Sequence, residues 1–153
     1  MSRQLPIRYA RRMGYVLIVD DDCDGAKMLK RFLERRLGCR VECVPDGEEA
    51  IGAIVGNPPD VLVLDLNMPR MDGLELLRVL RSYARLKATP VVMVSADAHA
   101  ERFDRARELG VVKIFLKASY KLEDLAACIK GLMGERPAFE STRASPSPPS
   151  TPA

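Results

Sequence analysis

Four apolar runs in this sequence are each followed at once by polar side chains that could take part in chemistry. The residues at these four points are Asp20 and Asp21, Asp65, Ser95, and Lys117. A carboxylate can act as a nucleophile, while a hydroxyl and a lysine ammonium group can bind the oxygens of a transferring phosphoryl group. This combination of side chains predicts a phosphoryl-accepting site in which Asp65 is the reactive carboxylate.

Asp65 is singled out by the residues around it, which read VLVLDLNMPRMDG at positions 61–73. A short, continuous apolar run such as residues 61–64 is typical of a buried parallel strand. The residues after Asp65 include Met-Pro and Asp-Gly pairs, which favour turns. Asp65 is thus expected at the carboxyl end of a strand, where open α/β sheets bind their ligands.

Three carboxylates in one pocket would repel one another unless a cation neutralised them. Mg²⁺ suits such a site because it prefers oxygen ligands and needs only one or two carboxylates besides waters and phosphate oxygens. The sequence therefore predicts magnesium as the cofactor of this pocket. A simpler alternative is that residues 20–22 only cap the helix that follows, since aspartate is a favoured N-cap residue.

The elements that would position these residues alternate regularly along the chain. Apolar runs predict strands at residues 15–19, 39–44, 61–64, 90–94 and 111–116. Helical periodicity predicts helices that end at Gly38 and that span residues 48–55, 74–84, 99–109 and 122–133. Such (βα)5 alternation implies an α/β fold with a parallel sheet wound on both faces, whose polar strand ends should meet in one crevice. The half-exposed pattern of residues 39–44 places that strand at a sheet edge.

In this order and at these intervals, the residues resemble the receiver domain of two-component response regulators, as in chemotaxis regulators. The resemblance covers about residues 14–134 and rests on Asp20-Asp21-Asp22, DLNMPRMDG around Asp65, Ser95-Ala96 and Lys117. It implies a doubly wound, flavodoxin-like three-layer sandwich with a five-stranded parallel sheet in the order 2-1-3-4-5. It also implies phosphorelay signal transduction through an aspartyl phosphate.

The resemblance implies a role for each acidic residue of the pocket. Asp65 would be the phosphoacceptor, and Asp21 and Asp65 would ligate Mg²⁺ directly. The backbone carbonyl of Asn67 would be a third protein ligand, while Asp20 would hold a metal-bound water. Asp22 stands where many members of the family have glutamate, a change that we expect to be tolerated.

The remaining site residues would bind the phosphoryl group and pass the signal on. By the same resemblance, Lys117 would contact a phosphoryl oxygen. Ser95 would swing towards the phosphoryl group and draw its loop inwards. Asn67 and Asp97 occupy the two variable positions that tune the lifetime of the aspartyl phosphate in this family.

Two positions depart from the family pattern on the signalling side of the domain. The family often has an aromatic switch residue three positions before the lysine, where this chain has Ile114, and the neighbouring Phe115 should face the other way. Ala118 replaces the proline that usually follows Lys117. Because a cis bond before a residue other than proline costs about 2.5–4 kcal/mol, the bond that joins these two residues should be trans or locally strained.

Composition divides the chain into a domain and two extensions. The formal net charge is +3, and the four arginines of residues 1–13 exceed that value, so the rest of the chain is close to neutral. We expect a basic flexible arm at residues 1–13, the receiver domain at residues 14–134 and a disordered Pro/Ser-rich tail at residues 135–153. A near-neutral domain argues against nucleic acid as a partner. No apolar run approaches the ~18 residues of a membrane span and no signal peptide is recognised, which predicts a cytoplasmic protein.

These features predict a single-domain response regulator. Asp65 would accept a phosphoryl group from a histidine kinase or a phosphotransfer protein, and the domain would then switch a surface that binds an output protein. The chain would not be an enzyme in its own right, although it would catalyse its own phosphorylation and dephosphorylation. It would be a monomer, or a dimer that forms on phosphorylation.

Two other functions are left open at this point. A pseudo-receiver would have the same fold and bind partners without phosphorylation; the complete set of acids, serine and lysine argues against it, while Ile114 and Ala118 argue weakly for it. A phosphatase of the haloacid-dehalogenase type would also use an aspartyl nucleophile and Mg²⁺. Its Asp-x-Asp-x-Thr motif is incomplete here, because Asp24 stands where threonine is needed.

Few other residues indicate a function. The four cysteines lack metal-binding spacing and are expected to be reduced, semi-buried thiols. Arg102, Arg105 and Arg107 in the helix predicted at residues 99–109 are expected first to form a solvated face, and second to dock an acidic partner. His99 should face solvent at the start of that helix.

Overall fold

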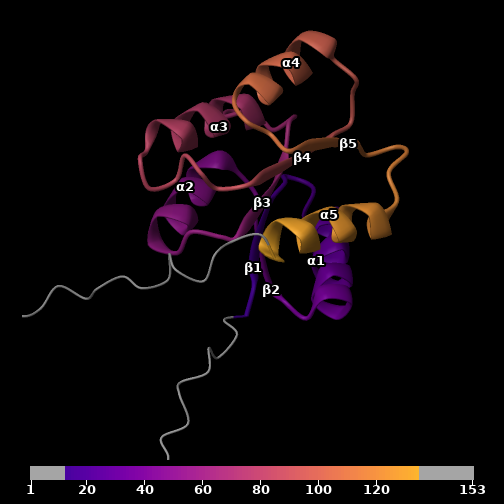
Figure 1. Cartoon of the computed structure of the whole chain (residues 1–153). Coiled ribbons are helices and arrows are strands. Elements are labelled where there is room, and N and C mark those ends of the chain that lie inside the picture. The colour runs from indigo at the N-terminus through magenta and orange to yellow at the C-terminus, as the bar shows by residue number, and fades with distance from the viewer. Residues whose placement is uncertain (1–12, 135–153) are drawn as a thin grey trace, which may run out of the picture.

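The computed structural model describes residues 13–134, in which five strands alternate with five helices (Figure 1). The strands are β1 (Tyr15–Val19), β2 (Arg40–Val44), β3 (Val61–Asp65), β4 (Val91–Ser95) and β5 (Lys113–Leu116). The helices are α1 (Cys23–Leu37), α2 (Gly47–Gly56), α3 (Gly73–Ser82), α4 (Ala100–Glu108) and α5 (Leu122–Gly134). The predicted tail, residues 135–153, lies outside the described residues, and so does the predicted arm, residues 1–13, except for Met13.

The strands form one parallel sheet in the order β2-β1-β3-β4-β5. Strands β1, β3 and β4 are buried along their whole length, as their continuous apolar runs predict. Strand β2 pairs with β1 at one edge and is only partly buried, which confirms the position predicted from its alternating pattern. The predicted α/β fold and strand order are therefore confirmed.

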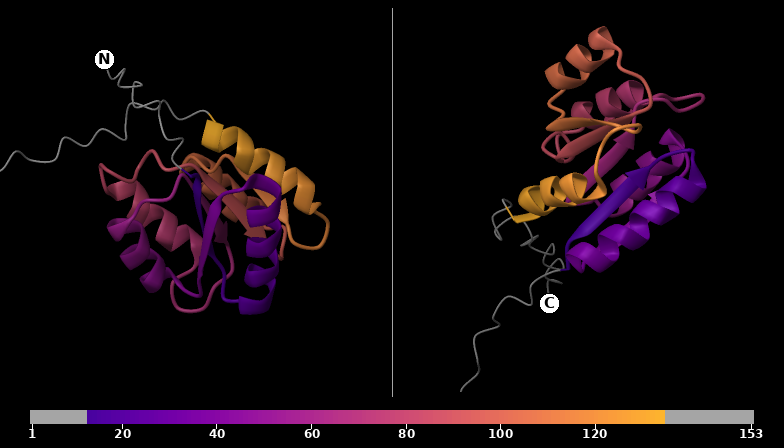
Figure 2. Two further views of the ribbon diagram at one scale, coloured as in Figure 1. Left: turned by 90° about the horizontal axis from the view of Figure 1, so that it is seen from below. Right: turned by 90° about the vertical axis from the view of Figure 1, so that its right-hand side faces the viewer.

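Helices cover both faces of the sheet and divide the apolar core into two clusters. Val63 and Val92 belong to the cluster with helices α1 and α5. Leu64 and Met93, the next residues along the same strands, belong to the cluster with helices α2, α3 and α4. In Figure 2, the left view shows α1 and α5 together on one side of the sheet and α2 and α3 on the other. Because successive strand residues point to opposite faces, this alternation also decides which side each residue at a strand end occupies.

Aspartate side chains begin three of the helices. Asp22, Asp46 and Asp72 precede α1, α2 and α3, and each accepts a hydrogen bond from a backbone N–H three residues further on. Such caps satisfy N–H groups that have no partner within the helix. The capping alternative therefore applies to Asp22, while Asp20 and Asp21 precede the cap and are available for another role.

The element boundaries differ from the predicted ones by at most two residues. Helix α1 is followed by Gly38 as predicted, with a φ of 59° that glycine adopts without strain. Helix α3 ends at Ser82 rather than at residue 84, and β5 begins at Lys113 rather than at residue 111. Strands β3 and β4 extend one residue further than predicted, so Asp65 and Ser95 are the last residues of their strands.

The described part of the chain shows neither a membrane span nor a disulfide. No helix between residues 13 and 134 is both long and apolar enough to cross a bilayer. The four cysteines all lie within this range and are free thiols. Cys39 is buried, but Cys23 is exposed, so the expectation of semi-buried thiols is wrong for Cys23.

Candidate functional site

Two acidic residues meet at the centre of the carboxyl edge of the sheet. Strands β1 and β3 are neighbours in the sheet although β2 lies between them in the chain, so the order of the strands reverses at this point. Crevices at such reversals are the usual ligand sites of open α/β sheets. Asp65 ends β3 and Asp20 follows β1, and the pairing of these strands brings both carboxylates to the crevice.

Lys117 connects the two carboxylates. Its Nζ lies 3.0 Å from Asp20 Oδ2 and 3.2 Å from Asp65 Oδ2, although Lys117 follows β5, two strands away from β3. The backbone N–H of Asn67 donates to the other oxygen of Asp65 at 3.0 Å. Asp65 is only 3% exposed. Each of its oxygens is therefore held by a donor inside the protein.

Asp21 completes a group of three carboxylates. One oxygen from each of Asp20, Asp21 and Asp65 lies within 4.8 Å of the other two. An octahedral Mg²⁺ holds its ligands at 2.0–2.1 Å, so that opposite ligands are about 4 Å apart. The three oxygens are therefore close enough to bind one divalent cation after a rearrangement of their side chains, and carboxylates are the hard donors that magnesium prefers.

The surroundings shift the pKa values of the carboxylate and the lysine. Burial raises the pKa of Asp65 from 3.8 to about 6; the Asn67 N–H and Lys117 oppose this shift, and the charge of Asp20 adds to it. Burial would lower the pKa of Lys117, but its bonds to Asp20 and Asp65 outweigh burial and raise it. Lys117 is thus a cation at neutral pH, and Asp65 is ionised at an energetic cost that a bound cation would reduce.

Ser95 does not face the acidic group in this structure. Its hydroxyl donates to the backbone carbonyl of Asp97 at 2.7 Å and is fully buried. Asp65 continues the alternation of Val63 on the side of α1 and α5, whereas Ser95 continues that of Met93 on the side of α2, α3 and α4. The placement of Ser95 in the same crevice therefore stays a prediction, and the predicted swing of its side chain would have to break the bond to Asp97.

The two departures from the family pattern near β5 are Ile114, with Phe115 beside it, and Ala118. Ile114 is partly buried in the cluster with α2, α3 and α4. Phe115 is buried on the opposite side, where its ring meets Tyr120 edge to face at 5.8 Å, which confirms that it faces away from the position of the family's aromatic residue. The described residues contain no cis peptide bond, so the bond from Lys117 to Ala118 is trans, as one of the two predicted options.

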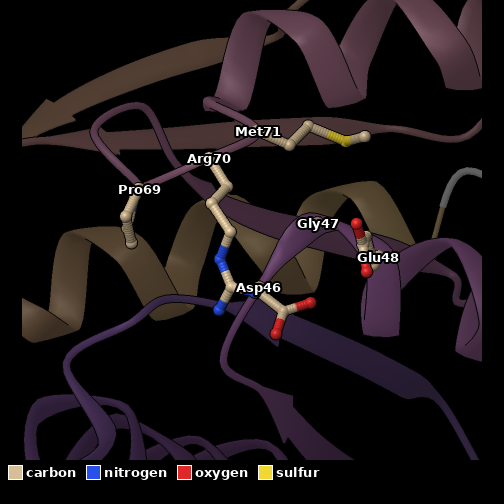
Figure 3. A pocket seen from close by; sticks show the side chains of 6 residues that line it. All are labelled: Asp46, Gly47, Glu48, Pro69, Arg70 and Met71. Carbon is tan, nitrogen blue, oxygen red and sulfur yellow. The ribbon is translucent and has the colours of Figure 1, made fainter.

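The loop between β3 and α3 packs against the turn that precedes α2 (Figure 3). Met71 lies over Gly47, where a Cβ would be 2.7 Å from the methionine sulfur. The neighbouring Arg70 has a φ of 66°, an uncommon conformation for a residue with a side chain. The cavity between these segments has a volume of about 10 Å³, which is room for one water molecule at most. This hollow is therefore a packing feature and not a ligand site.

A larger cavity of about 200 Å³ opens beside the acidic group. Asp20, Asp65 and Lys117 line its polar end. Apolar side chains of β1, β3, β4, α1 and the start of α5, among them Met28 and Leu122, line much of the rest. The acidic group is thus reached from the side of the domain where α1 and α5 pack.

One residue that touches the site is not predicted by the sequence pattern. Arg102, expected in a solvated face, donates from Nη1 to Asn67 Oδ1 at 2.7 Å and pairs with Asp72 at 3.2 Å. Arg105 and Arg107 are exposed, as expected. In the sequence, only the position of Arg102 in the first turn of the helix could have indicated this contact. That position does not distinguish an arginine that reaches a neighbouring loop from one that faces water.

Known proteins resemble this chain over nearly the whole described region. The response regulator receiver domain family matches residues 16–130. The chain is 38% identical over 119 residues to the response regulator MprA of Mycobacterium sp. (strain KMS), covering 77% of this chain and 50% of that protein. It is 37% identical over 103 residues to protein-glutamate methylesterase/protein-glutamine glutaminase 3 of Geobacter sulfurreducens, covering 67% of this chain and 27% of that protein. The chain thus spans between about a quarter and a half of the length of these curated relatives.

Solved structures agree with the sequence relatives. The receiver domain of the Francisella response regulator 1452 superposes with a TM-score of 0.71 at 30% identity, covering 79% of this chain and 97% of that one. Receiver domains are phosphoacceptor signalling modules of two-component systems. With its parallel sheet, its carboxylate group and its lysine in place, this chain belongs to the response regulator receiver domain family.

Proposed function

We propose that this domain accepts a phosphoryl group on Asp65 from a phosphohistidine of a histidine kinase or phosphotransfer protein, in a reaction that depends on Mg²⁺. The observation that carries the proposal is the Lys117 bridge to a buried carboxylate: Nζ lies 3.2 Å from Asp65 Oδ2 beside two further carboxylates. Membership of a phosphoacceptor family supports it.

The chemistry of the transfer falls mainly on Asp65 and Lys117. A carboxylate oxygen of Asp65 forms a bond to phosphorus as the bond from phosphorus to the donor imidazole breaks, and the imidazole nitrogen keeps the electron pair. Lys117, already 3.2 Å from this carboxylate, turns towards an oxygen of the transferring group and stabilises its charge. Domain and donor together would form the transfer site, and the domain would also catalyse the later hydrolysis of its own aspartyl phosphate.

The acidic group would hold the metal. Asp21 and Asp65, together with the backbone carbonyl of Asn67, would bind Mg²⁺ directly, and Asp20 would hold a metal-bound water. The ion, when bound, neutralises charge on the phosphoryl oxygens. The phosphoryl group adds a charge of about −1.5 to −2 to this crevice. Neutralisation by the ion and by Lys117 is therefore needed both to reach the product and to keep it.

Phosphorylation would be read out on the other side of β4. Ser95 would exchange its bond to Asp97 for a phosphoryl oxygen and pull the loop before α4 inwards. This shifts the population of two states of the surface formed by α4, β5 and α5, where an output protein would bind. Ile114, Asn67 and Asp97 would set how far and for how long that shift persists. The predictions of a stand-alone domain, of a cytoplasmic location and of phosphorylation-dependent dimers stay predictions.

Incubation with Mg²⁺ and acetyl phosphate tests the proposal. Intact-mass measurement should show one added phosphoryl group on the wild type and on Asp104→Asn, an exposed control carboxylate. Asp65→Asn should add none, and chelation of Mg²⁺ should abolish the addition. A wild type that takes up neither a phosphoryl group nor beryllium fluoride would instead support a pseudo-receiver. Repeated turnover of a phosphate ester would support the phosphatase alternative.

A further inference from the structure

Polar contacts hold helix α4 to the domain at both of its ends, in addition to the packing of the partly buried Phe103 against the core. Ala106 is its one buried residue. In Figure 1, α4 lies at the periphery beside α3, away from α1 and α5. Just beyond its C-terminus, Arg81 of α3 donates from Nε to the carbonyl of Leu109 at 2.7 Å. In its first turn, Arg102 reaches back to the loop between β3 and α3. These two arginines are thus polar anchors at the two ends of a helix that buries only one residue completely.

Arg102 binds three separate points of the loop that follows the proposed phosphoacceptor. Nη1 donates to Asn67 Oδ1 at 2.7 Å, and Nη2 donates to the Leu66 carbonyl and to Asp72 Oδ2, each at 3.2 Å. Leu66 is the first residue of the loop, and Asp72 is the cap that begins α3. The side chain of Arg102 is 29% exposed, compared with 62% for Arg107 on the same helix. One guanidinium group thus ties α4 to both ends of this loop.

The contact with Arg102 fixes the orientation of the Asn67 amide. Because Oδ1 accepts from the guanidinium, Nδ2 must point elsewhere, and it is buried without a hydrogen-bond partner. A buried donor that lacks an acceptor is costly and is satisfied by any acceptor that comes within reach. The backbone N–H of the same residue already lies 3.0 Å from Asp65 Oδ1. A phosphoryl group on Asp65 would bring three acceptor oxygens next to this residue.

We propose that Arg102 is a positioning residue of the phosphorylation site, which orients the Asn67 side chain and couples the first turn of α4 to the state of Asp65. This inference rests on the proposed function. Arg102 acts through a direct polar contact with the loop after Asp65. On the same face of the domain, Ile114 stands where the family often has an aromatic switch residue, so that kind of switch is absent from this position. Coupling of this kind is reciprocal, so whatever fixes α4 also fixes the Asn67 amide beside the phosphoryl group.

The decay of the phosphorylated protein gives the decisive measurement. Wild type, Arg102→Met and Arg105→Met are phosphorylated with acetyl phosphate and Mg²⁺, freed of the donor, and followed by intact mass. Arg102→Met should lose its phosphoryl group about threefold faster or more. Arg102 and Asn67 belong to one hydrogen-bond network, and residues in such a network have measurable interaction energies. Arg102→Lys keeps the charge but not the planar fork of donors, so it should behave like Arg102→Met. Arg105→Met, which changes an exposed arginine of the same helix, should decay like the wild type.

A double-mutant cycle separates positioning from mere support of the fold. In an Asn67→Ala background, which keeps the backbone N–H and carbonyl, Arg102→Met should no longer change the decay rate. Equal effects in both backgrounds, or no effect in the wild-type background, would overturn the inference even if thermal stability falls. If the wild type itself takes up no phosphoryl group, the proposed function fails first and the inference fails with it. If the wild type is phosphorylated and Arg102→Met decays at the wild-type rate, the inference is overturned and the proposed function is not.

Discussion

Gly73 lies directly against the backbone of Asp65: a Cβ at residue 73 would be 2.5 Å from the Asp65 carbonyl oxygen and 2.9 Å from the α-carbon of Leu66. The Gly73 N–H also donates to the Leu66 carbonyl at 3.1 Å. The first turn of α3 therefore packs on Asp65, the proposed phosphoacceptor. Glycine is needed here for close approach, since no positive φ is found at this position.

Gly73→Ala should therefore destabilise the domain by about 1–3 kcal/mol, as overpacking of a filled site does. Backbone atoms are the obstacle, and they cannot move aside as a flexible side chain would. Urea denaturation followed by circular dichroism measures the change. Gly52→Ala is the matched control: it lies within α2 with open space around it and should stabilise the domain by about 0.5–1 kcal/mol. Equal stability of Gly73→Ala and wild type would contradict the packing described.

Asp65→Asn should stabilise the metal-free domain in a pH-dependent way. The pKa of Asp65 is raised from 3.8 to about 6 by burial, so the folded state binds a proton more tightly than the unfolded chain does. The wild type therefore loses stability as the pH rises from about 4 to about 6, and the loss is complete above that range. At 1.36 kcal/mol per pKa unit, the variant should gain about 1–3 kcal/mol at pH 7.5 and little at pH 4.

The measurement for Asp65→Asn is a series of urea titrations from pH 4 to pH 8 in the presence of a chelator. Asp97→Asn, which changes an exposed carboxylate, should follow the wild-type pH dependence. A gain for Asp65→Asn that is the same at every pH would show that the carboxylate is not the cause.

Mg²⁺ should stabilise the wild type, and this effect should depend on Asp21. A ligand that binds only the folded state raises its stability in proportion to the logarithm of its concentration. Asp21→Asn removes one of the three clustered carboxylates and should weaken binding measured by calorimetry about tenfold or more. Asp22→Asn is the control, because this residue caps α1 and asparagine caps equally well. Similar losses for both variants would argue against the metal site.

Arg81→Met should destabilise the domain without touching the acidic group. The Arg81 guanidinium donates to the backbone carbonyls of Leu109, Lys87 and Thr89 at 2.7, 2.9 and 2.8 Å. Loss of these donors should reduce the free energy of unfolding by about 2–4 kcal/mol, since each hydrogen bond contributes about 1 kcal/mol and burial adds a penalty. Arg78→Met, an exposed arginine on the same helix, should stay within about 0.5 kcal/mol of the wild type. Denaturation curves for the two variants that coincide would refute this role.

Much of the fold follows from local patterns. The apolar runs at β1, β3 and β4 are so continuous that they predict buried strands at nearly the observed residues. The exposed alternation of β2 predicts an edge strand. Asp65 could be predicted at a strand end because its flanking residues change from strand-forming to turn-forming within one position.

The side of the sheet that Ser95 faces could also have been derived, but only with the alternation counted from a known core residue. Met93 and Ser95 are two residues apart in one strand and therefore lie on the same face of the sheet. That α3 covers this face is known only once the helices are placed. Sequence spacing alone favours a single crevice for all the polar strand ends, whereas the Ser95 hydroxyl is bonded to the carbonyl of Asp97 in this structure.

By itself, the sequence determined which residues could do chemistry and which strands carry them, because residue type and hydrophobic period act over a few positions. The tertiary structure decided which of them meet. The bond from Lys117 to Asp20 joins residues 97 positions apart, and that from Arg102 to Asn67 joins residues 35 positions apart. Long, flexible cationic side chains reach many partners from one backbone position and leave no periodic signal, so only the packing of the sheet and its helices selects the partner.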